Sequence, residues 1–262
     1  MAPRRFPRNE HVRARRAFGQ NVLADPRAVR ALVTAAEIKP DTLVYEVGAG
    51  RGRLTTALLD RDADVVAYEV DPAMAAALPR HPRLTVRVED FLRARPPREP
   101  FAVVGNIPYA LTSAVVRWCL CAGTLTSATL LTQLEYARKR TGDYGRWSRL
   151  TVATWPRFTW QLAGRIPCTA FRPVPRVDGG ILSLARRPVP LVRPDAMPAY
   201  ERFVALGFTG TGGSLYASLS GRYGTKRVSA AFRATRLPTD RPVGEVWPEQ
   251  WLTLFRLLAA RR

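Results

Sequence analysis

Short apolar segments alternate with helical patterns between residues 43 and 140, and this alternation limits the fold more than any other feature of the chain. The apolar segments predict strands at 43–47, 65–69, 84–88, 101–105 and 128–133. The helical patterns between and after them predict helices at 54–59, 72–78, 112–120 and 134–140. Strands that alternate with helices form a parallel sheet with helices on both faces. The sequence therefore predicts an α/β fold with a doubly wound, Rossmann-like sheet.

A further pair of apolar segments extends this sheet. Residues 160–166 and 181–185 resemble the two arms of a hairpin, joined through 171–175. Such a pair adds an antiparallel strand to a sheet that is otherwise parallel.

The pattern changes after residue 190, where amphipathic helices are separated by Gly and Pro. These helices are predicted at 200–208, 225–233 and 249–260. We therefore expect three parts: a flexible basic arm at 1–16, a main domain at 17–190 and a small all-α domain at 191–262.

The charge of the chain indicates a polyanionic partner. Lys and Arg number 41 against 21 Asp and Glu, which gives a formal net charge of +20. Solubility does not require a charge of this size, and nucleic acid is the first candidate partner. In the arm we expect contacts to RNA phosphates, with a solvated tail as the alternative; the arginines concerned are Arg4, Arg5, Arg8, Arg13, Arg15 and Arg16. A second basic cluster consists of Arg138, Lys139 and Arg140.

Membrane and metal classes are disfavoured. No apolar run approaches the ~20 residues that a membrane span requires, and no apolar signal core follows Met1, so we expect a cytoplasmic protein. The three cysteines, Cys119, Cys121 and Cys168, lack CxxC spacing, and the chain has only two histidines. Buried free thiols are therefore expected, and no metal site.

A glycine-rich segment lies between the first predicted strand and the following helix, where a backbone can approach a nucleotide closely. Its glycines are Gly48, Gly50 and Gly52. The dehydrogenase fingerprint requires glycine five residues after the first, and that position holds Arg53. The Gly-x-Gly-x-Gly spacing looks like that of S-adenosylmethionine-dependent methyltransferases, and a plain strand–helix turn is the alternative.

Acidic residues follow the next two predicted strands. Glu69 lies 19 residues after Gly50, at the carboxyl edge of the sheet, where its carboxylate can accept both hydroxyls of a ribose. Asp90 follows the third strand and is positioned to receive the amino group of an adenine, with Phe91 beside the ring. A surface location is the alternative for each acid taken alone.

The tetrapeptide Asn106-Ile107-Pro108-Tyr109 follows the fourth predicted strand. It matches the Asn-x-Pro-aromatic signature of enzymes that methylate the exocyclic amines of nucleic-acid bases. The Asn106 side-chain oxygen and the Ile107 carbonyl can each accept one N–H of the amine, while Pro108 fixes the turn. Tyr109 offers a flat face on which the base can stack. The alternative is a proline-centred turn without catalytic meaning.

Two further segments complete an ordered set of motifs. Residues 19–23 are Gly-Gln-Asn-Val-Leu, and residues 171–178 are Phe-Arg-Pro-Val-Pro-Arg-Val-Asp. With the glycine loop and the tetrapeptide, they resemble the rRNA adenine N6-methyltransferase superfamily over about residues 13 to 185. This superfamily contains the erythromycin-resistance (Erm) enzymes and the 16S dimethyladenosine transferases. The chain departs from the family pattern at Val22, where Phe is usual, and at Gly179, where Ser is common.

The resemblance implies a class I methyltransferase domain at 17–190, with S-adenosylmethionine as cofactor and an RNA-binding domain at 191–262. It implies that the cofactor is held by Gln20, Asn21, Leu23, Gly48, Gly50, Glu69, Val70, Asp90, Phe91 and Asn106. It implies a catalytic pocket for the target adenine, made by Asn106, Ile107, Pro108 and Tyr109, with Phe171 as a second aromatic wall.

Within the superfamily the chain is most similar to the Erm branch. Ile107 stands where the dimethyladenosine transferases usually have Leu, and residues 133–140 and 141–147 also resemble Erm proteins. The Erm resemblance implies mono- or dimethylation of an adenine in the peptidyl-transferase loop of nascent or protein-poor 23S rRNA, by a monomer. This modification blocks macrolides, lincosamides and streptogramin B. Three alternatives remain: a 16S rRNA dimethyladenosine transferase, a non-catalytic nucleic-acid-binding relative, and a nicotinamide-dependent oxidoreductase, which Arg53 disfavours.

Overall fold

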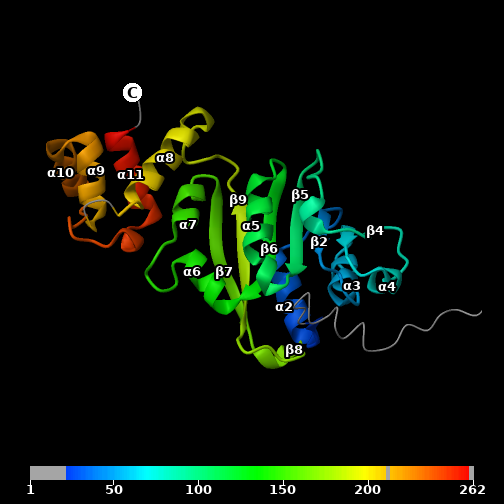
Figure 1. Ribbon diagram of the computed structural model, residues 1–262. Coiled ribbons are helices and arrows are strands. Elements are labelled where there is room, and N and C mark those ends of the chain that lie inside the picture. Colours follow the sequence, from blue (N-terminus) through cyan, green and yellow to red (C-terminus); the bar gives the residue numbers. More distant parts are fainter. Residues whose placement is uncertain (1–21, 211–212, 260–262) are drawn as a thin grey trace, which may run out of the picture. The chain divides into compact units, whose positions relative to one another are not determined.

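The computed structural model describes residues 22–210 and 213–259 (Figure 1). The predicted cofactor residues Gln20 and Asn21, and the predicted arm at 1–16, lie outside the described residues.

A seven-stranded sheet forms the centre of the fold, with the strand order β4-β3-β2-β5-β6-β9-β7 (Figure 1). Its strands are β2 (Leu43–Val47), β3 (Asp64–Tyr68), β4 (Leu84–Arg87), β5 (Phe101–Asn106), β6 (Leu125–Gln133), β7 (Phe158–Ile166) and β9 (Gly179–Arg186). A separate two-stranded sheet pairs β1 (Val22–Leu23) with β8 (Phe171–Arg172). All seven predicted strands are therefore present in the sheet, with ends that differ by at most three residues from the predicted ones.

The sheet is mostly parallel, as predicted. β2 is parallel to β3 and to β5, and the β3–β4 and β5–β6 pairs are parallel as well. β9 is antiparallel to β6, as two hydrogen bonds between the two segments show. The Thr132 hydroxyl donates to the Gly180 carbonyl (3.4 Å), and the Leu134 N–H donates to the Asp178 carbonyl (2.9 Å). The residue numbers of the donors increase while those of the acceptors decrease, which is the pattern of an antiparallel pair. The predicted antiparallel strand is confirmed.

Helices connect the strands and cover the sheet. They are α2 (Pro26–Ala36), α3 (Arg53–Leu59), α4 (Pro72–Ala76), α5 (Thr112–Cys121), α6 (Leu134–Thr141) and α7 (Arg149–Thr154). Single 3₁₀ turns occur at η1 (Phe91–Arg93), η2 (Tyr109–Leu111) and η3 (Cys168–Ala170). After the sheet come η4 (Pro194–Ala196), α8 (Met197–Gly207), α9 (Leu215–Tyr223), α10 (Thr225–Ala234), η6 (Val243–Glu245) and α11 (Pro248–Leu258).

Local chemistry explains where two of the helices begin. Asp25 precedes Pro26 and its carboxylate accepts the N–H of Arg27 (2.8 Å), so α2 starts with a side-chain cap and a proline at its first position. Asp71 and Pro72 repeat this arrangement at α4. Helix α2 was not among the predicted helices, although its cap signal is present in the sequence.

The described chain divides into two units by its internal contacts. Among the described residues, one unit contains 22–134 and 163–183, and the other contains 135–162, 184–210 and 213–259. The core of the first unit joins α2, α3 and the sheet around side chains such as Leu32 and Leu58, which are fully buried. The core of the second unit is aromatic and gathers Tyr200, Phe203 and Trp251 from α8 and α11. Each unit thus buries its own apolar side chains.

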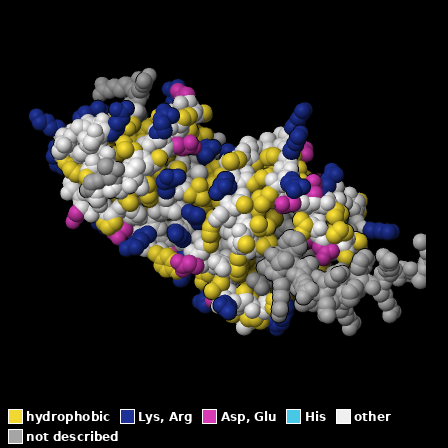
Figure 2. Space-filling view, viewed as in Figure 1, with side chains coloured by type: hydrophobic (Ala, Val, Ile, Leu, Met, Phe, Trp, Pro, Cys, Tyr) yellow, Lys and Arg dark blue, Asp and Glu magenta, His cyan; other side chains and the backbone are white. Residues whose placement is uncertain are grey.

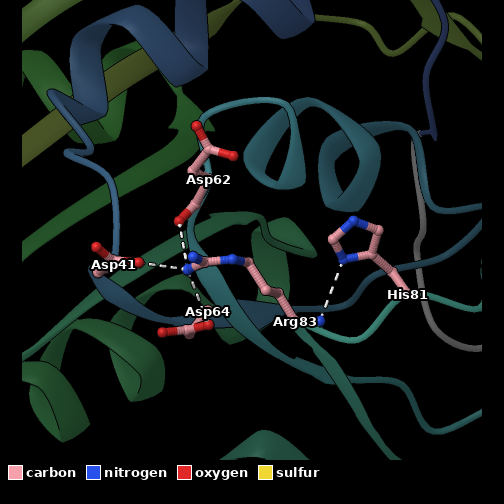
Figure 3. A network of polar contacts seen from close by, with 5 residues as sticks. All are labelled: Asp41, Asp62, Asp64, His81 and Arg83. Carbon is pink, nitrogen blue, oxygen red and sulfur yellow. Dashed lines mark hydrogen bonds and ion pairs between the residues drawn. The ribbon is translucent and has the colours of Figure 1, made fainter.

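A polar network joins the amino-terminal ends of three strands in the first unit (Figure 3). The Arg83 guanidinium donates to the carboxylates of Asp41 (2.6 Å) and Asp64 (3.3 Å) and to the carbonyl of Asp62 (3.1 Å). Arg83 precedes β4, Asp64 begins β3, and Asp41 lies just before β2. The network therefore ties together the starts of β2, β3 and β4, at the edge of the sheet away from the glycine loop.

None of the helices in the described part of the chain has the length and apolar character that crossing a membrane requires.

Candidate active site

The glycine loop lies between β2 and α3 and has a conformation that requires glycine. Gly48, Gly50 and Gly52 have φ values of +71°, +56° and +77°. Residues other than glycine rarely adopt this left-handed backbone conformation. A Cβ built on Gly48 would meet nothing within 4 Å, and one on Gly50 would meet only the Gly48 carbonyl at 4.0 Å. The loop therefore presents bare backbone to open space, as a cradle for a bound nucleoside requires.

Glu69 fixes this loop through both of its carboxylate oxygens. One oxygen accepts the N–H of Gly50 (2.8 Å) and the other accepts the N–H of Asp71 (2.9 Å). The side chain is only 2% exposed. Each oxygen keeps a second lone pair, so the carboxylate can still accept a hydrogen bond from a ligand. The predicted ribose-binding residue is thus held rigidly beside the cradle.

A second carboxyl group lies behind the loop. Glu46, in β2, is completely buried and accepts a hydrogen bond from the Thr55 hydroxyl (2.6 Å). Burial raises the pKa of Glu46 to about 7, the bond from Thr55 opposes this rise, and the charge of Glu69 adds to it. Glu46 was not among the predicted site residues, because a sequence cannot indicate how deeply a strand residue is buried.

The tetrapeptide turn begins where β5 ends. Asn106 is the last residue of β5, and Pro108 precedes the 3₁₀ turn η2, which Tyr109 begins. β5 pairs with β2 so that Gly105 lies opposite Val47. A Cβ on Gly105 would lie 2.9 Å from the Val47 Cβ and 3.0 Å from its carbonyl oxygen, so only glycine permits this close approach. The turn is thereby brought next to the glycine loop.

One hollow in the first unit is lined by both motifs. Predicted site residues in its lining are Leu23, Gly48, Gly50, Asn106, Ile107, Pro108 and Tyr109. The other lining residues are Val22, Val29, Ala49, Arg51, Arg53 and Leu54. The sequence therefore predicted about half of the residues that line the hollow, and these come from three separate segments of the chain.

Arg53 is the most informative residue that sequence reasoning did not assign to the site. It lines the hollow and begins α3, and its guanidinium donates to the Ala24 carbonyl. This bond ties the helix after the glycine loop to the segment between β1 and α2. The available signal was a basic residue immediately after the glycine loop, but in the sequence analysis Arg53 served only to disfavour a dehydrogenase.

Tyr109 is half-buried, and its hydroxyl is an unsatisfied polar group that lines the hollow. The hydroxyl oxygen is buried and has no hydrogen-bond partner among the described residues. Burial raises the pKa of the Tyr109 phenol above its usual range, and the nearby Asp178 and Cys168 raise it further. The ring is therefore neutral at physiological pH. Ile107 is almost completely buried, at 2% exposure, which leaves its backbone as the group available for chemistry.

Phe171 does not line the hollow. It is 0% exposed and belongs to the core of the first unit, with Leu23, Leu131 and Ile181. It pairs with Leu23 in the β1–β8 sheet. In this conformation Phe171 supports the wall that Leu23 forms and does not itself offer a face to a base.

The remaining predicted nucleoside residues lie at the ends of β3 and β4. Val70 follows Glu69 and is exposed. The Asp90 carboxylate accepts the N–H of Leu92 (2.9 Å) and so caps η1. Phe91 is buried and packs on the rings of Tyr68 and Trp118. None of these three residues is in the lining of the hollow, and neither is Glu69, although all of them lie at the edge of the sheet where the strands end.

The basic cluster on α6 makes contacts within the second unit. Arg138 pairs with Asp143 (2.8 Å) and donates to the Tyr144 hydroxyl (3.0 Å), and Arg140 stacks on the Tyr136 ring at 4.8 Å. Lys139 is exposed. Two of the three predicted RNA-binding residues of this cluster are thus partly occupied by intramolecular partners.

Within residues 22–210 and 213–259, no group of three or more His, Cys, Asp or Glu side chains is arranged to hold a metal ion. All three cysteines are free thiols. Cys119 is buried as predicted, whereas Cys168 is half-buried and Cys121 is exposed, so the expectation of burial was wrong for Cys121.

The fold and the hollow together define a class of enzyme. A mostly parallel sheet with one antiparallel strand, whose first long strand leads into a glycine cradle, is the architecture of Rossmann-like class I methyltransferases. The Asn-Ile-Pro-Tyr turn, whose sequence matches the signature of those that methylate exocyclic amines, lies beside that cradle.

Comparison with known proteins identifies the family. The model of the ribosomal RNA adenine dimethylase family matches residues 11–260. The chain is 53% identical to an rRNA adenine N-6-methyltransferase of Streptomyces fradiae, over 94% of this chain and 79% of the relative. It is 35% identical to the mycinamicin-resistance protein MyrB of Micromonospora griseorubida, over 94% of this chain and 79% of that protein. The crystal structure of the 23S rRNA methyltransferase ErmE matches with a TM-score of 0.88 and 48% identity, covering 92% of this chain and 100% of that one.

The chain therefore belongs to the ribosomal RNA adenine dimethylase family, whose members are S-adenosylmethionine-dependent methyltransferases of rRNA adenine.

Proposed function

We propose that this chain transfers methyl groups from S-adenosylmethionine to N6 of an adenine in the peptidyl-transferase loop of 23S rRNA. Such a modification confers resistance to macrolides, lincosamides and streptogramin B. The observation that carries the proposal is the joint lining of one hollow by the glycine cradle and the Asn106–Tyr109 turn, in a chain 48% identical to a 23S rRNA methyltransferase. The similarity to a mycinamicin-resistance protein supports the resistance phenotype.

The residues around the cradle fit S-adenosylmethionine. The backbone of Gly48 and Gly50 leaves space for it, and the Glu69 carboxylate has lone pairs for two ribose hydroxyls. We assign the adenine of the cofactor to the Asp90 carboxylate and to Val70, at the ends of the neighbouring strands. Gln20, Asn21 and Leu23 would cover the methionine end. When bound, the cofactor supplies a methyl group activated by a positively charged sulfur.

The Asn106–Tyr109 turn would prepare the acceptor nitrogen. The lone pair of an adenine amine is delocalised into the ring, so the amine is a poor nucleophile. Hydrogen bonds from the amine to the Asn106 side-chain oxygen and the Ile107 carbonyl draw electron density back to the nitrogen and fix its direction. Tyr109 would stack on the base, which must first leave its RNA stack at a cost of a few kcal/mol. The methylated amine is acidic as the bond forms, so water can take its proton without a general base from the protein.

We also propose how the rest of the chain contributes. The arm at 1–16 and the basic residues Arg138, Lys139 and Arg140 would contact RNA phosphates, and the helical domain at 191–262 would add further RNA contacts. The substrate would be nascent or protein-poor 23S rRNA, methylated in the cytoplasm by a monomer. The net charge of +20 supports this assignment.

Radiolabelled S-adenosylmethionine tests the target. The wild-type chain should label protein-free 23S RNA, and primer extension across domain V should then stop at a single adenine. Label found only in immature small ribosomal subunits would replace this proposal with a 16S dimethyladenosine transferase. Label in neither RNA, with RNA binding intact, would identify a non-catalytic binder.

An Asn106→Ala variant tests the mechanism. It should lose methyl transfer while still binding RNA. Gln161→Ala is the matched control, because it also removes an amide side chain, from an exposed position on β7 that does not line the hollow. Unchanged methyl transfer by Asn106→Ala would refute the role given to Asn106.

A further inference from the structure

A second hollow lies entirely within the unit that contains α8 and α11. It has a volume of about 500 Å³, which is sufficient for a nucleotide. Its lining comes from the segment before α8, from α8 itself and from the end of α11, and consists of Leu191, Val192, Arg193, Asp195, Ala196, Ala199, Arg202, Phe255, Arg256 and Ala259. None of these residues belongs to the active site.

The lining has an apolar floor and a basic rim. The floor consists of the buried Val192 and Phe255, with the partly buried Ala196 and Ala199. The rim carries three arginines, Arg193, Arg202 and Arg256, against one acid, Asp195. Basic side chains are spread over the surface of the α8–α11 region, with apolar surface between them (Figure 2). An apolar floor with a cationic rim is the chemistry that receives a base or ribose together with its phosphate.

The three arginines differ in how available they are. Arg202 is exposed and has no hydrogen-bond or ion-pair partner within the part of the chain that the structure describes. Arg256 donates one N–H to the Leu191 carbonyl (3.2 Å), which holds its guanidinium at the rim and leaves its other donors available. Arg193 makes a bidentate pair with Asp195 (3.1 and 3.0 Å), and both side chains are largely exposed, at 84% and 68%. Exposed pairs of this kind contribute little stability, so a phosphate can displace the carboxylate.

We infer that this hollow binds a nucleotide of the substrate RNA, with its phosphate against Arg202 and Arg256 and its base or ribose against the apolar floor. The inference rests on the proposed function, because it takes the RNA substrate as the ligand. RNA is favoured over a free mononucleotide because the arginines are exposed at an open rim, where a continuous strand can enter and leave. The hollow would act as an anchor for RNA outside the target pocket.

The test is the salt dependence of RNA binding by an Arg202→Gln/Arg256→Gln double variant. Binding to a fluorescent domain V transcript is measured by anisotropy at several salt concentrations. Loss of two phosphate contacts should lower the slope of log K against log salt by about 1.5, since each contact contributes about 0.7 to 0.9. With a short RNA hairpin that carries only the target loop, kcat should be unchanged, and KM for the full transcript should rise.

A matched control removes two positive charges elsewhere in the same unit. Arg222 and Arg233 are exposed residues near the ends of α9 and α10 and do not line the hollow. The Arg222→Gln/Arg233→Gln variant should keep the wild-type slope. An equal loss of slope in both double variants would overturn the proposal, because net charge alone would then account for the effect.

Further outcomes separate this proposal from the proposed function. If the wild type binds and methylates 23S RNA but the Arg202→Gln/Arg256→Gln variant keeps the wild-type slope, the hollow is not an RNA site although the function stands. If the double variant differs from wild type only on ribosomal particles and not on protein-free RNA, the occupant is a protein and the proposal is wrong. If the wild type neither binds nor methylates RNA, the proposed function fails and this inference fails with it. Should the double variant not fold, Arg202→Gln alone, at a side chain without a partner, should give about half the change in slope.

Discussion

Replacing Glu69 with Gln is the sharpest test of the cofactor site, because this carboxylate has two separable tasks. It accepts the backbone N–H groups of Gly50 (2.8 Å) and Asp71 (2.9 Å), one on each oxygen. It would also accept the two ribose hydroxyls of the cofactor. A glutamine has the same shape but only one acceptor oxygen, so it can accept from only one of the two backbone N–H groups. Its NH₂ group then faces the other N–H, which loses its acceptor.

The expected losses follow from these bonds. One buried N–H without a partner costs about 1 to 3 kcal/mol, so the free energy of unfolding should fall by about that amount. Bonds to a charged acceptor contribute about 1 kcal/mol more than bonds to a neutral one, so two ribose hydroxyls together lose about 2 kcal/mol. The Kd for S-adenosylmethionine should therefore rise about 30-fold, since each 1.4 kcal/mol is about a factor of ten.

Isothermal titration calorimetry gives the Kd, and urea unfolding gives the stability of each variant. Glu89→Gln is the control, because it removes the same charge from an exposed neighbour at the end of β4 and should change the Kd less than about threefold. A Glu69→Gln variant that binds the cofactor as tightly as the wild type would refute the assignment of the ribose to Glu69. Lower stability with an unchanged Kd would show that Glu69 only fixes the glycine loop.

Three further predictions concern buried residues of the first unit. Because the pKa of Glu46 is about 7 in the folded state against 4.5 as the usual value, folding favours the protonated group. Stability should therefore fall by about 3 kcal/mol as pH rises from about 4.5 to above 7, and Glu46→Gln, which can still accept from Thr55, should flatten this dependence in urea unfolding at pH 5 and pH 8. Gly105→Ala should cost about 1 to 3 kcal/mol through its clash with Val47, and single-turnover methyl transfer should slow more than cofactor binding weakens; wild-type kinetics would contradict the close approach. Phe171→Ala should cost about 3 to 5 kcal/mol in thermal or urea unfolding, and a loss under 1 kcal/mol would show that the ring is not a core residue.

The strands were predictable because their signal is local. The limits of β2 were predicted correctly from an apolar run, and those of β5 and β4 to within one residue. Helices α7 and α9 were missed as well, and both are stabilised by packing against other helices of the second unit. Ser148 and Ser214 cap these two helices, so a signal for their first residues was present in the sequence.

Burial was the property that sequence reasoning could not supply. Phe171 is an aromatic residue in a motif, and nothing in the motif distinguishes a pocket wall from a core side chain. The tertiary structure decided this, because the β1–β8 pairing places Leu23 beside Phe171 and the ring is buried in a core with Leu131 and Ile181. Phe91 is a similar case, enclosed by Tyr68 and Trp118 from distant parts of the chain.

The sequence by itself determined the chemistry available to this protein: a glycine loop, an acid after a strand and an Asn-Ile-Pro-Tyr turn, each at the end of a predicted strand. These are properties of short segments, and short-range steric and hydrogen-bonding preferences fix them. Only the tertiary structure decided which side chains are accessible and which charges act on a buried carboxyl group, as Glu69 does on Glu46. Exposure and electrostatic coupling depend on residues far apart in the chain, and they exist only once the sheet has brought the strand ends together.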